Sequence, residues 1–178
     1  FTVPLILCIE TSNDICSVSL SKSSQLINLQ ENKRAKSHAE SLNTSIIKLF
    51  ENTKYSLKDL SAIAISKGPG SYTGLRIGVS TAKGLCFGLG IPLISVETLE
   101  VLTRTFLLEH SVNENDILIP MIDARRMEVY TAIFNTRFTK LEETKALILE
   151  PTSFDQFLET SACHFIGDGA EKSSNLYQ

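Results

Sequence analysis

The stretch that decides the fold is residues 5–20, which read LILCIETSNDICSVSL. Residues 5–9 form a continuous apolar run, and residues 15–20 alternate between apolar and polar side chains, which is the period of a half-buried strand. The polar residues 11–14 between the two runs predict a turn, so the stretch predicts a β-hairpin. A third, weaker strand pattern follows at residues 25–29.

Downstream of the hairpin, helix and strand patterns alternate. Ser37-His38-Ala39-Glu40 matches a helix-capping box and predicts a helix over residues 38–51. Further helices are predicted at residues 72–89, 97–109 and 153–159, and further strands at 60–66, 91–95, 146–149, 163–166 and, as a pair joined by a turn, within 117–134. Three antiparallel strands that lead into α/β crossovers are typical of the ribonuclease-H-like and actin-like ATPase (ASKHA) folds. We therefore expect an α/β fold of two lobes with mixed sheets.

The composition excludes several classes of protein. The chain has 178 residues, with 17 Lys and Arg against 20 Asp and Glu, so a net charge of -3 creates no overall field for RNA, DNA or an anionic membrane. A nucleic-acid role would need a local patch or a basic partner. The four cysteines are scattered without a C-x-x-C pair, which favours free thiols in a reducing compartment. With no apolar run long enough for a membrane span, we expect a cytoplasmic protein without membrane contact.

The glycine-rich stretch KGPGSYTGLRIG, residues 67–78, is a candidate phosphate loop. A Walker A motif requires Lys after its last glycine, but Leu75 follows Gly74, and the glycine spacing is one residue too long for a dinucleotide fingerprint. A helix N-terminus at this place can still receive an anion. The small residues within the helix instead favour close packing, because each mid-helix glycine costs roughly 0.8–1.0 kcal/mol relative to Ala. That packing is expected either within the chain or against a second chain.

Three carboxylates, Glu10, Asp123 and Asp168, follow predicted strands. In this group of folds such carboxylates hold divalent ions, which supports the alternative of a metal-dependent nuclease or ATPase. The histidines lack metal-ligand spacing, and we interpret His38 as a surface or packing residue. No nucleophile motif of a hydrolase is present.

Five motifs of the chain have to be considered together. They are Ile9-Glu10-Thr11-Ser12, Ser37-His38-Ala39-Glu40, the stretch from Gly68 to Gly78, Pro92-Leu93-Ile94-Ser95-Val96 and Ile122-Asp123-Ala124-Arg125. Together they resemble the TsaB family, also called YeaZ. The similarity covers at least residues 5–134, whereas residues 135–178 match loosely, mainly through Gly167-Asp168-Gly169-Ala170.

The resemblance implies a role in making threonylcarbamoyladenosine at position 37 of tRNA. It implies a non-catalytic dimerisation and activating subunit that pairs with a TsaD-type paralogue, the transferase, and works with a TsaE-type ATPase. We expect a homodimer in isolation and contact with tRNA only through the complex. An actin-like lobe with the dimerisation helices is expected at residues 1–100, and a second lobe at residues 101–178 that is cut short at its C-terminus. The older glycoprotease label finds no chemical support in these residues.

The resemblance also offers a way to decide whether the chain is an enzyme or a partner subunit. TsaD-type proteins carry a His-x-x-x-His metal pair on the helix that follows the strand corresponding to residues 92–96. Thr98 and Leu102 occupy the two positions in this chain. Leu cannot bind a metal and a lone Thr hydroxyl is a poor ligand, so we expect no metal site and no catalytic residue.

The resemblance further suggests an interface made by the helices at residues 38–50 and 72–89, so that Gly78→Leu is expected to abolish pairing with TsaD while leaving the monomer folded. The residues assigned to this interface are His38, Leu42, Ile46, Leu75, Gly78, Ala82 and Cys86. No cofactor is required on this interpretation, and the ligand that the ancestry suggests is ATP or ADP at the complex interface. Its candidate residues are Glu10, Thr11, Gly70, Ser71, Asp123, Gly167 and Asp168.

Overall fold

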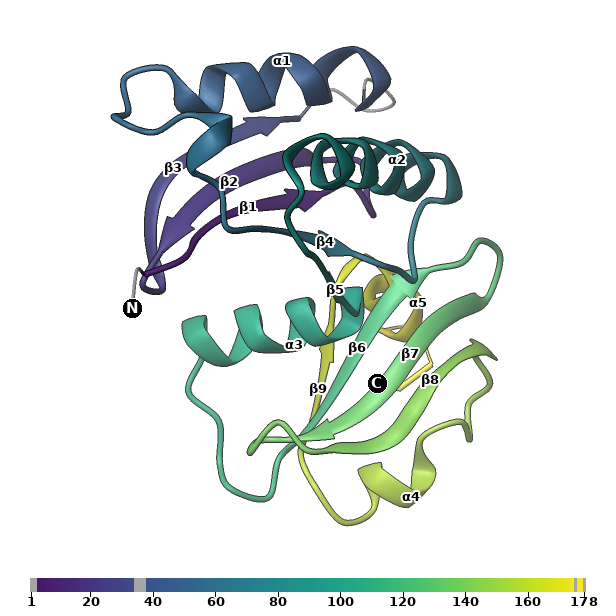
Figure 1. The fold of residues 1–178 in the computed structure, drawn as a ribbon. Helices are drawn as coiled ribbons and strands as arrows, with labels where there is room; N and C mark the ends of the chain where they lie inside the picture. Colours follow the sequence, from purple (N-terminus) through teal and green to yellow (C-terminus); the bar gives the residue numbers. More distant parts are fainter. Residues whose placement is uncertain (1–2, 34–37, 175, 178) are drawn as a thin grey trace. The chain divides into compact units, whose positions relative to one another are not determined.

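The computed structural model describes residues 3–33, 38–174, 176 and 177, which divide into two compact units. The first unit covers Phe1–Glu97 and the second covers Thr98–Gln178. Each unit is built on one mixed β-sheet, and Figure 1 shows the course of the chain through both. The helices of the described residues include none that is long and apolar enough to cross a membrane.

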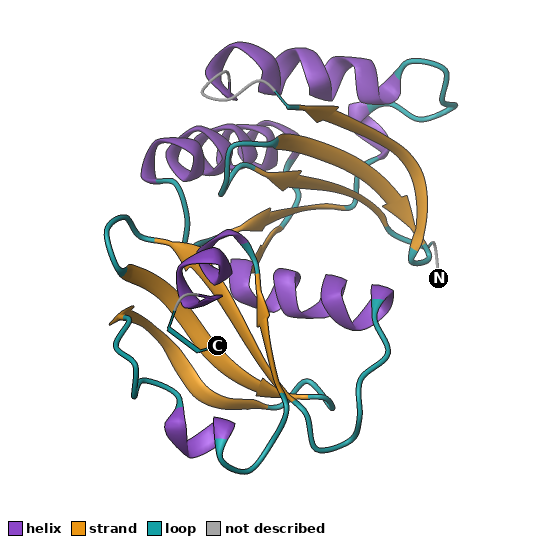
Figure 2. Cartoon of the chain, turned by 180° about the vertical axis from the view of Figure 1, so that it is seen from behind, coloured by secondary structure: helices purple, strands orange, loops and turns teal. Residues whose placement is uncertain are grey.

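The first unit is a five-stranded sheet whose strands run in the order β3-β2-β1-β4-β5. Strands β1, β2 and β3 are antiparallel, whereas β4 and β5 run parallel to β1. Helices α1 and α2 lie side by side over one face of this sheet (Figures 1 and 2). The elements are β1 (Leu5–Glu10), β2 (Cys16–Lys22), β3 (Gln25–Asn32), α1 (His38–Phe50), a 3₁₀ turn (Leu57–Asp59), β4 (Ala62–Ser66), α2 (Tyr72–Leu89) and β5 (Leu93–Val96).

The centre of the first unit is β1, because it pairs with strands on both sides. Leu7 lies opposite Leu20 on β2 and Ile63 on β4, and all three side chains are fully buried. Burial alternates along β1 and β2, as expected for strands with one face under helices. The apolar faces of α1 and α2 join this core. The hydrophobic periods of residues 5–20 therefore determine both the pairing and the covered face.

Helix α2 has a clear start and a clear end. Ser71 precedes it, and its side chain accepts a hydrogen bond from the Gly74 N–H at 3.3 Å. Gly90 ends it in the left-handed conformation, with φ of 67°, and donates its N–H to Cys86 O. These two caps give the helix the bounds that the sequence predicts.

The second unit has a four-stranded sheet in the order β8-β7-β6-β9, in which β9 is parallel to β6 and the other pairs are antiparallel. This order repeats the first four positions of the first sheet. The elements are α3 (Thr98–Glu109), β6 (Ile117–Asp123), β7 (Glu128–Asn135), β8 (Lys140–Ile148), α4 (Asp155–Leu158), β9 (Cys163–Ile166), a 3₁₀ turn (Asp168–Ala170) and α5 (Glu171–Ser174).

Strand β6 is buried on both faces, which explains its uninterrupted apolar run. Ile119 and Met121 belong to one core cluster with Phe154, whereas Leu118 belongs to a second cluster with Leu99 of α3. Pro120 has no N–H to donate, and the pairing of β6 with β7 skips Ile119 and Pro120 while the register stays the same on either side. Thr131 donates its hydroxyl to Pro120 O at 2.9 Å, so this buried carbonyl has a donor.

The α/β class, the two mixed sheets and most predicted elements are confirmed. The prediction of a strand at residues 146–149 was too short, because β8 already begins at Lys140. One face of this edge strand is exposed and carries charged residues, so a search for apolar runs detects only its end. The helix predicted at 153–159 is confined to Asp155–Leu158. Ser37, and with it the predicted capping box, lies outside the described residues.

Ile63 at the centre of the first sheet provides a test of this core. Ile63→Ala removes a fully buried side chain, so we expect the free energy of unfolding to fall by about 2–5 kcal/mol in a urea titration. Ile47→Ala is the control, because Ile47 on α1 is 66% exposed and its truncation should change stability by less than about 0.5 kcal/mol. Equal losses for the two variants would contradict this description of the core.

Candidate functional site

Close packing of α2 on the loop after β1 shapes the first unit. Gly74 and Gly78 face Thr11, and a Cβ on Gly74 would overlap Thr11 O, while one on Gly78 would overlap Thr11 Oγ1. Thr11 and Ser12 are buried, and within the described residues their hydroxyls have no hydrogen-bond partner. The glycines at these two positions therefore serve packing within the chain.

The turn before α2 packs against the same loop. Ser71 N–H donates to Ser12 O at 2.6 Å, and a Cβ on Gly70, whose φ is 155°, would come within 2.7 Å of Ser12 Cβ. The Gly74 N–H is taken by Ser71 Oγ. Two of the donors that an anion at this helix N-terminus would use are thus engaged within the chain.

The Glu10 carboxylate connects the loop of Thr11 and Ser12 to the end of β4. One carboxylate oxygen accepts the Ser12 N–H at 2.6 Å, and the other accepts the hydroxyl of Ser66 at the end of β4. Both oxygens of this half-buried side chain therefore have protein donors. Glu10 positions the loop against the sheet, which a residue in this place can do without any metal ion.

Asp123 and Asp168 come together in the second unit, where Asp123 N–H donates to Asp168 Oδ1 at 3.0 Å. Asp123 Oδ1 accepts from Lys172 Nζ at 2.8 Å and from the Arg125 N–H. The Lys172 contact is the main cause that holds the pKa of Asp123 below its usual value, and the Arg125 N–H adds to it. Among the described residues, no group of three His, Cys, Asp or Glu side chains is placed to hold a metal ion.

Gly167 is needed for close approach to β6. Its φ is 101°, and a Cβ there would overlap Met121 O and come within 2.6 Å of Leu102 Cδ2. Leu102 packs in the core cluster on the α3 side of the sheet, and Thr98 is buried without a hydrogen-bond partner for its hydroxyl within the described residues. The two positions aligned with a metal pair therefore lie on a helix that packs in the core.

The residues predicted to contact a partner are mostly buried within the first unit. Leu42, Ile46, Ala82 and Cys86 belong to its core cluster, and the His38 ring nitrogen Nε2 lies 2.8 Å from Asn13 O. The buried residues are His38, Leu42, Ile46, Gly78, Ala82 and Cys86, while Leu75 is half-buried. The opposite faces of α1 and α2 are the ones that the fold leaves exposed.

The opposite face of α2 is exposed and contains a residue that the sequence interpretation missed. Phe87 is 93% exposed, and a Cβ on Gly84 or Gly88 would meet no atom within 4 Å. We refer to Arg76, Ser80, Lys83, Gly84, Phe87 and Gly88 as the outer face of α2. The sequence contained a signal for the exposure of Phe87. Gly74, Gly78, Ala82 and Cys86 recur every four residues on one helix face, and Phe87 lies outside that face.

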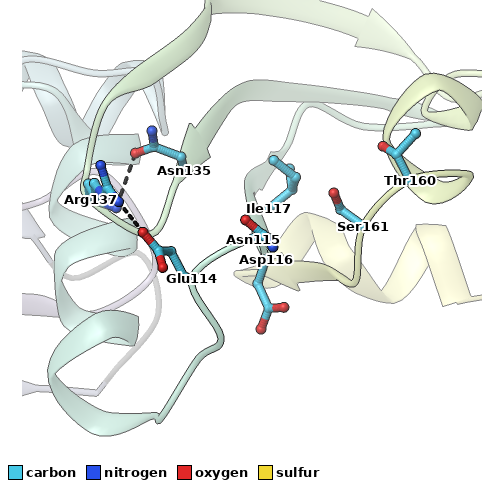
Figure 3. A pocket seen from close by; sticks show the side chains of 8 residues that line it. All are labelled: Glu114, Asn115, Asp116, Ile117, Asn135, Arg137, Thr160 and Ser161. Carbon is cyan, nitrogen blue, oxygen red and sulfur yellow. Dashed lines mark hydrogen bonds and ion pairs between the residues drawn. The ribbon is translucent and has the colours of Figure 1, made fainter.

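A polar pocket of about 420 Å³ lies in the second unit (Figure 3). Arg137 points toward Glu114 and forms an ion pair with it, and the hydroxyls of Thr160 and Ser161 line another side. Asp116 is already paired, because its carboxylate lies 2.9 Å from His164 Nε2, the contact that most lowers its pKa. Two charged groups that line the pocket, Glu114 and Asp116, are thus engaged within the chain by Arg137 and His164.

The sheet order 3-2-1-4-5, with antiparallel strands followed by parallel crossovers, defines the class of protein. It is that of the actin-like ATPase and ribonuclease-H-like folds. The structure of YeaZ from Pseudomonas aeruginosa superposes with a TM-score of 0.81 at 24% identity and covers 98% of this chain and 81% of that one.

Sequence comparison identifies the family. Residues 27–172 match the family model described as TsaD, tRNA N6-adenosine threonylcarbamoyltransferase. The tRNA threonylcarbamoyladenosine biosynthesis protein TsaB of Buchnera aphidicola from Schizaphis graminum is 34% identical over 81% of this chain and 68% of that protein. TsaB of Bacillus subtilis is 34% identical over 78% of this chain and 58% of its own. The chain belongs to the TsaB family, which supports a role in tRNA threonylcarbamoyladenosine biosynthesis, and it spans about 58–68% of the length of these two relatives.

Substitution of two glycines of α2 by alanine should change the free energy of unfolding in opposite directions. Gly78→Ala is expected to lower the free energy of unfolding by about 1–3 kcal/mol, because the new methyl group meets Thr11. Gly84→Ala should raise it by roughly 0.8–1.0 kcal/mol, since the site is open and Ala favours helix. Chemical denaturation of both variants measures the difference. A neutral Gly78→Ala would refute the packing of α2 on the Thr11 loop, which also predicts that Gly78→Leu damages the fold itself.

Proposed function

We propose that the chain is a non-catalytic partner subunit in tRNA threonylcarbamoyladenosine biosynthesis, which pairs with a TsaD-type paralogue and works with a TsaE-type ATPase. Membership in the TsaB family supports a place in a TsaD-containing assembly. The observation that carries the proposal is the outer face of α2, where Phe87 is 93% exposed beside two glycines with open space. An exposed aromatic ring next to accessible backbone suits the centre of a protein interface.

Helix α1 extends the proposed surface, because it packs beside α2 and exposes Ile47 at 66%. A specific interface hides at least about 1,000 Å² in total, which two adjacent helices are able to supply. In the absence of the paralogue, the same surface is expected to bind a second copy of the chain, since self-complementary helix faces readily form two-fold dimers.

A non-catalytic role agrees with the residues at the aligned metal positions. Leu102 is half-buried and packs against a core cluster beside Gly167, and an apolar side chain has no ligand atom to offer. The carboxylates of the alternative nuclease or ATPase are also engaged, Glu10 by Ser12 and Ser66, and Asp123 by Lys172. ATP or ADP at a complex interface stays a prediction, and the engaged donors around Ser71 do not favour a phosphate there.

Substitution of Phe87 tests the interface. Phe87→Asp should weaken binding to a TsaD-type protein at least about 30-fold, because it places a charge at the centre of the proposed contact. Leu108→Asp is the matched control, since Leu108 on α3 is 87% exposed and lies outside the proposed surface. Binding is measured by isothermal titration calorimetry, with circular dichroism of each variant to confirm folding. Equal affinities for Phe87→Asp and the wild type would exclude this face.

The alternative enzyme predicts a different result. The purified chain is expected to show no Mg²⁺-dependent hydrolysis of ATP and no cleavage of RNA or DNA, whereas it should stimulate threonylcarbamoyl transfer when it is added to a TsaD-type and a TsaE-type protein. Hydrolysis that Asp123→Asn abolishes would contradict the non-catalytic role, because Asp123 is the carboxylate that the alternative requires.

A further inference from the structure

The turn between β6 and β7 places two arginines at its tip. Arg125 and Arg126 have φ values of 72° and 48°, and Ser23 and Ser24 in the turn between β2 and β3 have the same left-handed conformation. Positive φ at two consecutive residues is the ordinary geometry of a tight hairpin turn, in which Asn and Gly are preferred over Arg. The turn therefore projects two adjacent guanidinium groups from the end of the hairpin.

The two guanidinium groups also differ from the other described arginines. Arg76 lies over the ring of Tyr72, Arg104 lies 3.6 Å from the centre of the Phe138 ring, and Arg137 pairs with Glu114. Within the described residues, Arg125 and Arg126 are exposed and their side chains form no hydrogen bond, ion pair or ring contact. The charge of Arg125 also contributes to the lowered pKa of Asp123, and both exposed guanidinium groups can still be reached by a ligand.

The acidic residues at the base of the turn are already engaged. Asp123 is neutralised by Lys172, whose Nζ lies 2.8 Å from the carboxylate and 2.9 Å from Glu128 O. Asp168 accepts the Asp123 N–H from the neighbouring loop. Lys172 thus forms the ion pair with Asp123, and neither arginine at the tip is held in an ion pair among the described residues.

We propose that Arg125 and Arg126 contact the phosphodiester backbone of the RNA substrate when the chain acts in its assembly. Guanidinium groups match phosphate oxygens in geometry, and backbone contacts position an RNA without reading its bases. An exposed pair of cations suits a polymer that is reached from outside, whereas a small nucleotide is held in a concave site. The inference rests on the proposed function and gives the otherwise acidic chain a local site for tRNA.

The test uses an Arg125→Asn, Arg126→Gly double variant, because Asn and Gly adopt positive φ more easily than Arg. Its melting temperature should equal or exceed that of the wild type, and its pairing with a TsaD-type protein should be unchanged. The affinity of the assembly for tRNA, measured by fluorescence anisotropy, should fall about tenfold near 0.1 M salt. The slope of log K against log salt should become shallower by about 1.4–1.8, since two phosphate contacts are lost.

Arg137→Gln combined with Lys145→Gln is the matched control. It also removes two positive charges, but both side chains already pair with Glu114 and Glu142. This control should retain the wild-type affinity and salt slope. Unchanged tRNA binding in the Arg125→Asn, Arg126→Gly assembly would overturn the inference alone, as would a variant that loses affinity only for ATP. A wild-type chain that neither pairs with the transferase nor stimulates it would overturn the proposed function and this inference with it.

Discussion

The contact between the Thr11 loop and the glycine face of α2 is the constraint on which the first unit depends. The backbone oxygen of Thr11 lies so close to Gly74, and its side-chain Oγ1 so close to Gly78, that a Cβ at either position would overlap it. Glu10 fixes the loop from the opposite side through Ser12 and Ser66, so the end of β1, the end of β4 and the start of α2 are tied together. The orientation of α2 follows from this contact.

This orientation separates the two uses of glycine in one helix. Where α2 meets the loop, glycine permits close approach inside the unit; on the outer face, Gly84 and Gly88 leave the backbone accessible beside Phe87. The first use stabilises the fold, whereas the second costs helix stability without any gain within the unit. A cost without a local gain is the reason to look for a partner on that face.

The second unit repeats the strand order of the first, but it has two core clusters, one on each face of β6. Strand β6 is buried on both faces, and the polar groups gather beyond its end, where Asp123, Asp168 and Lys172 bond to one another. The sequence predicted carboxylates that follow these strands. The pairing of Asp123 with Lys172 depends on how α5 packs beside the end of β6, which no local pattern encodes.

The sequence by itself determined the order of the elements, the α/β class and the family, because hydrophobic periods, caps and the motif around Gly74 are local signals. Only the tertiary structure decided which face of each helix is free: Leu42, Ile46, Ala82 and Cys86 fill the core, and Phe87 does not. The physical reason is that burial depends on contacts between residues far apart in the chain, such as Gly78 with Thr11, and a periodic pattern shows that two faces differ without showing what covers them.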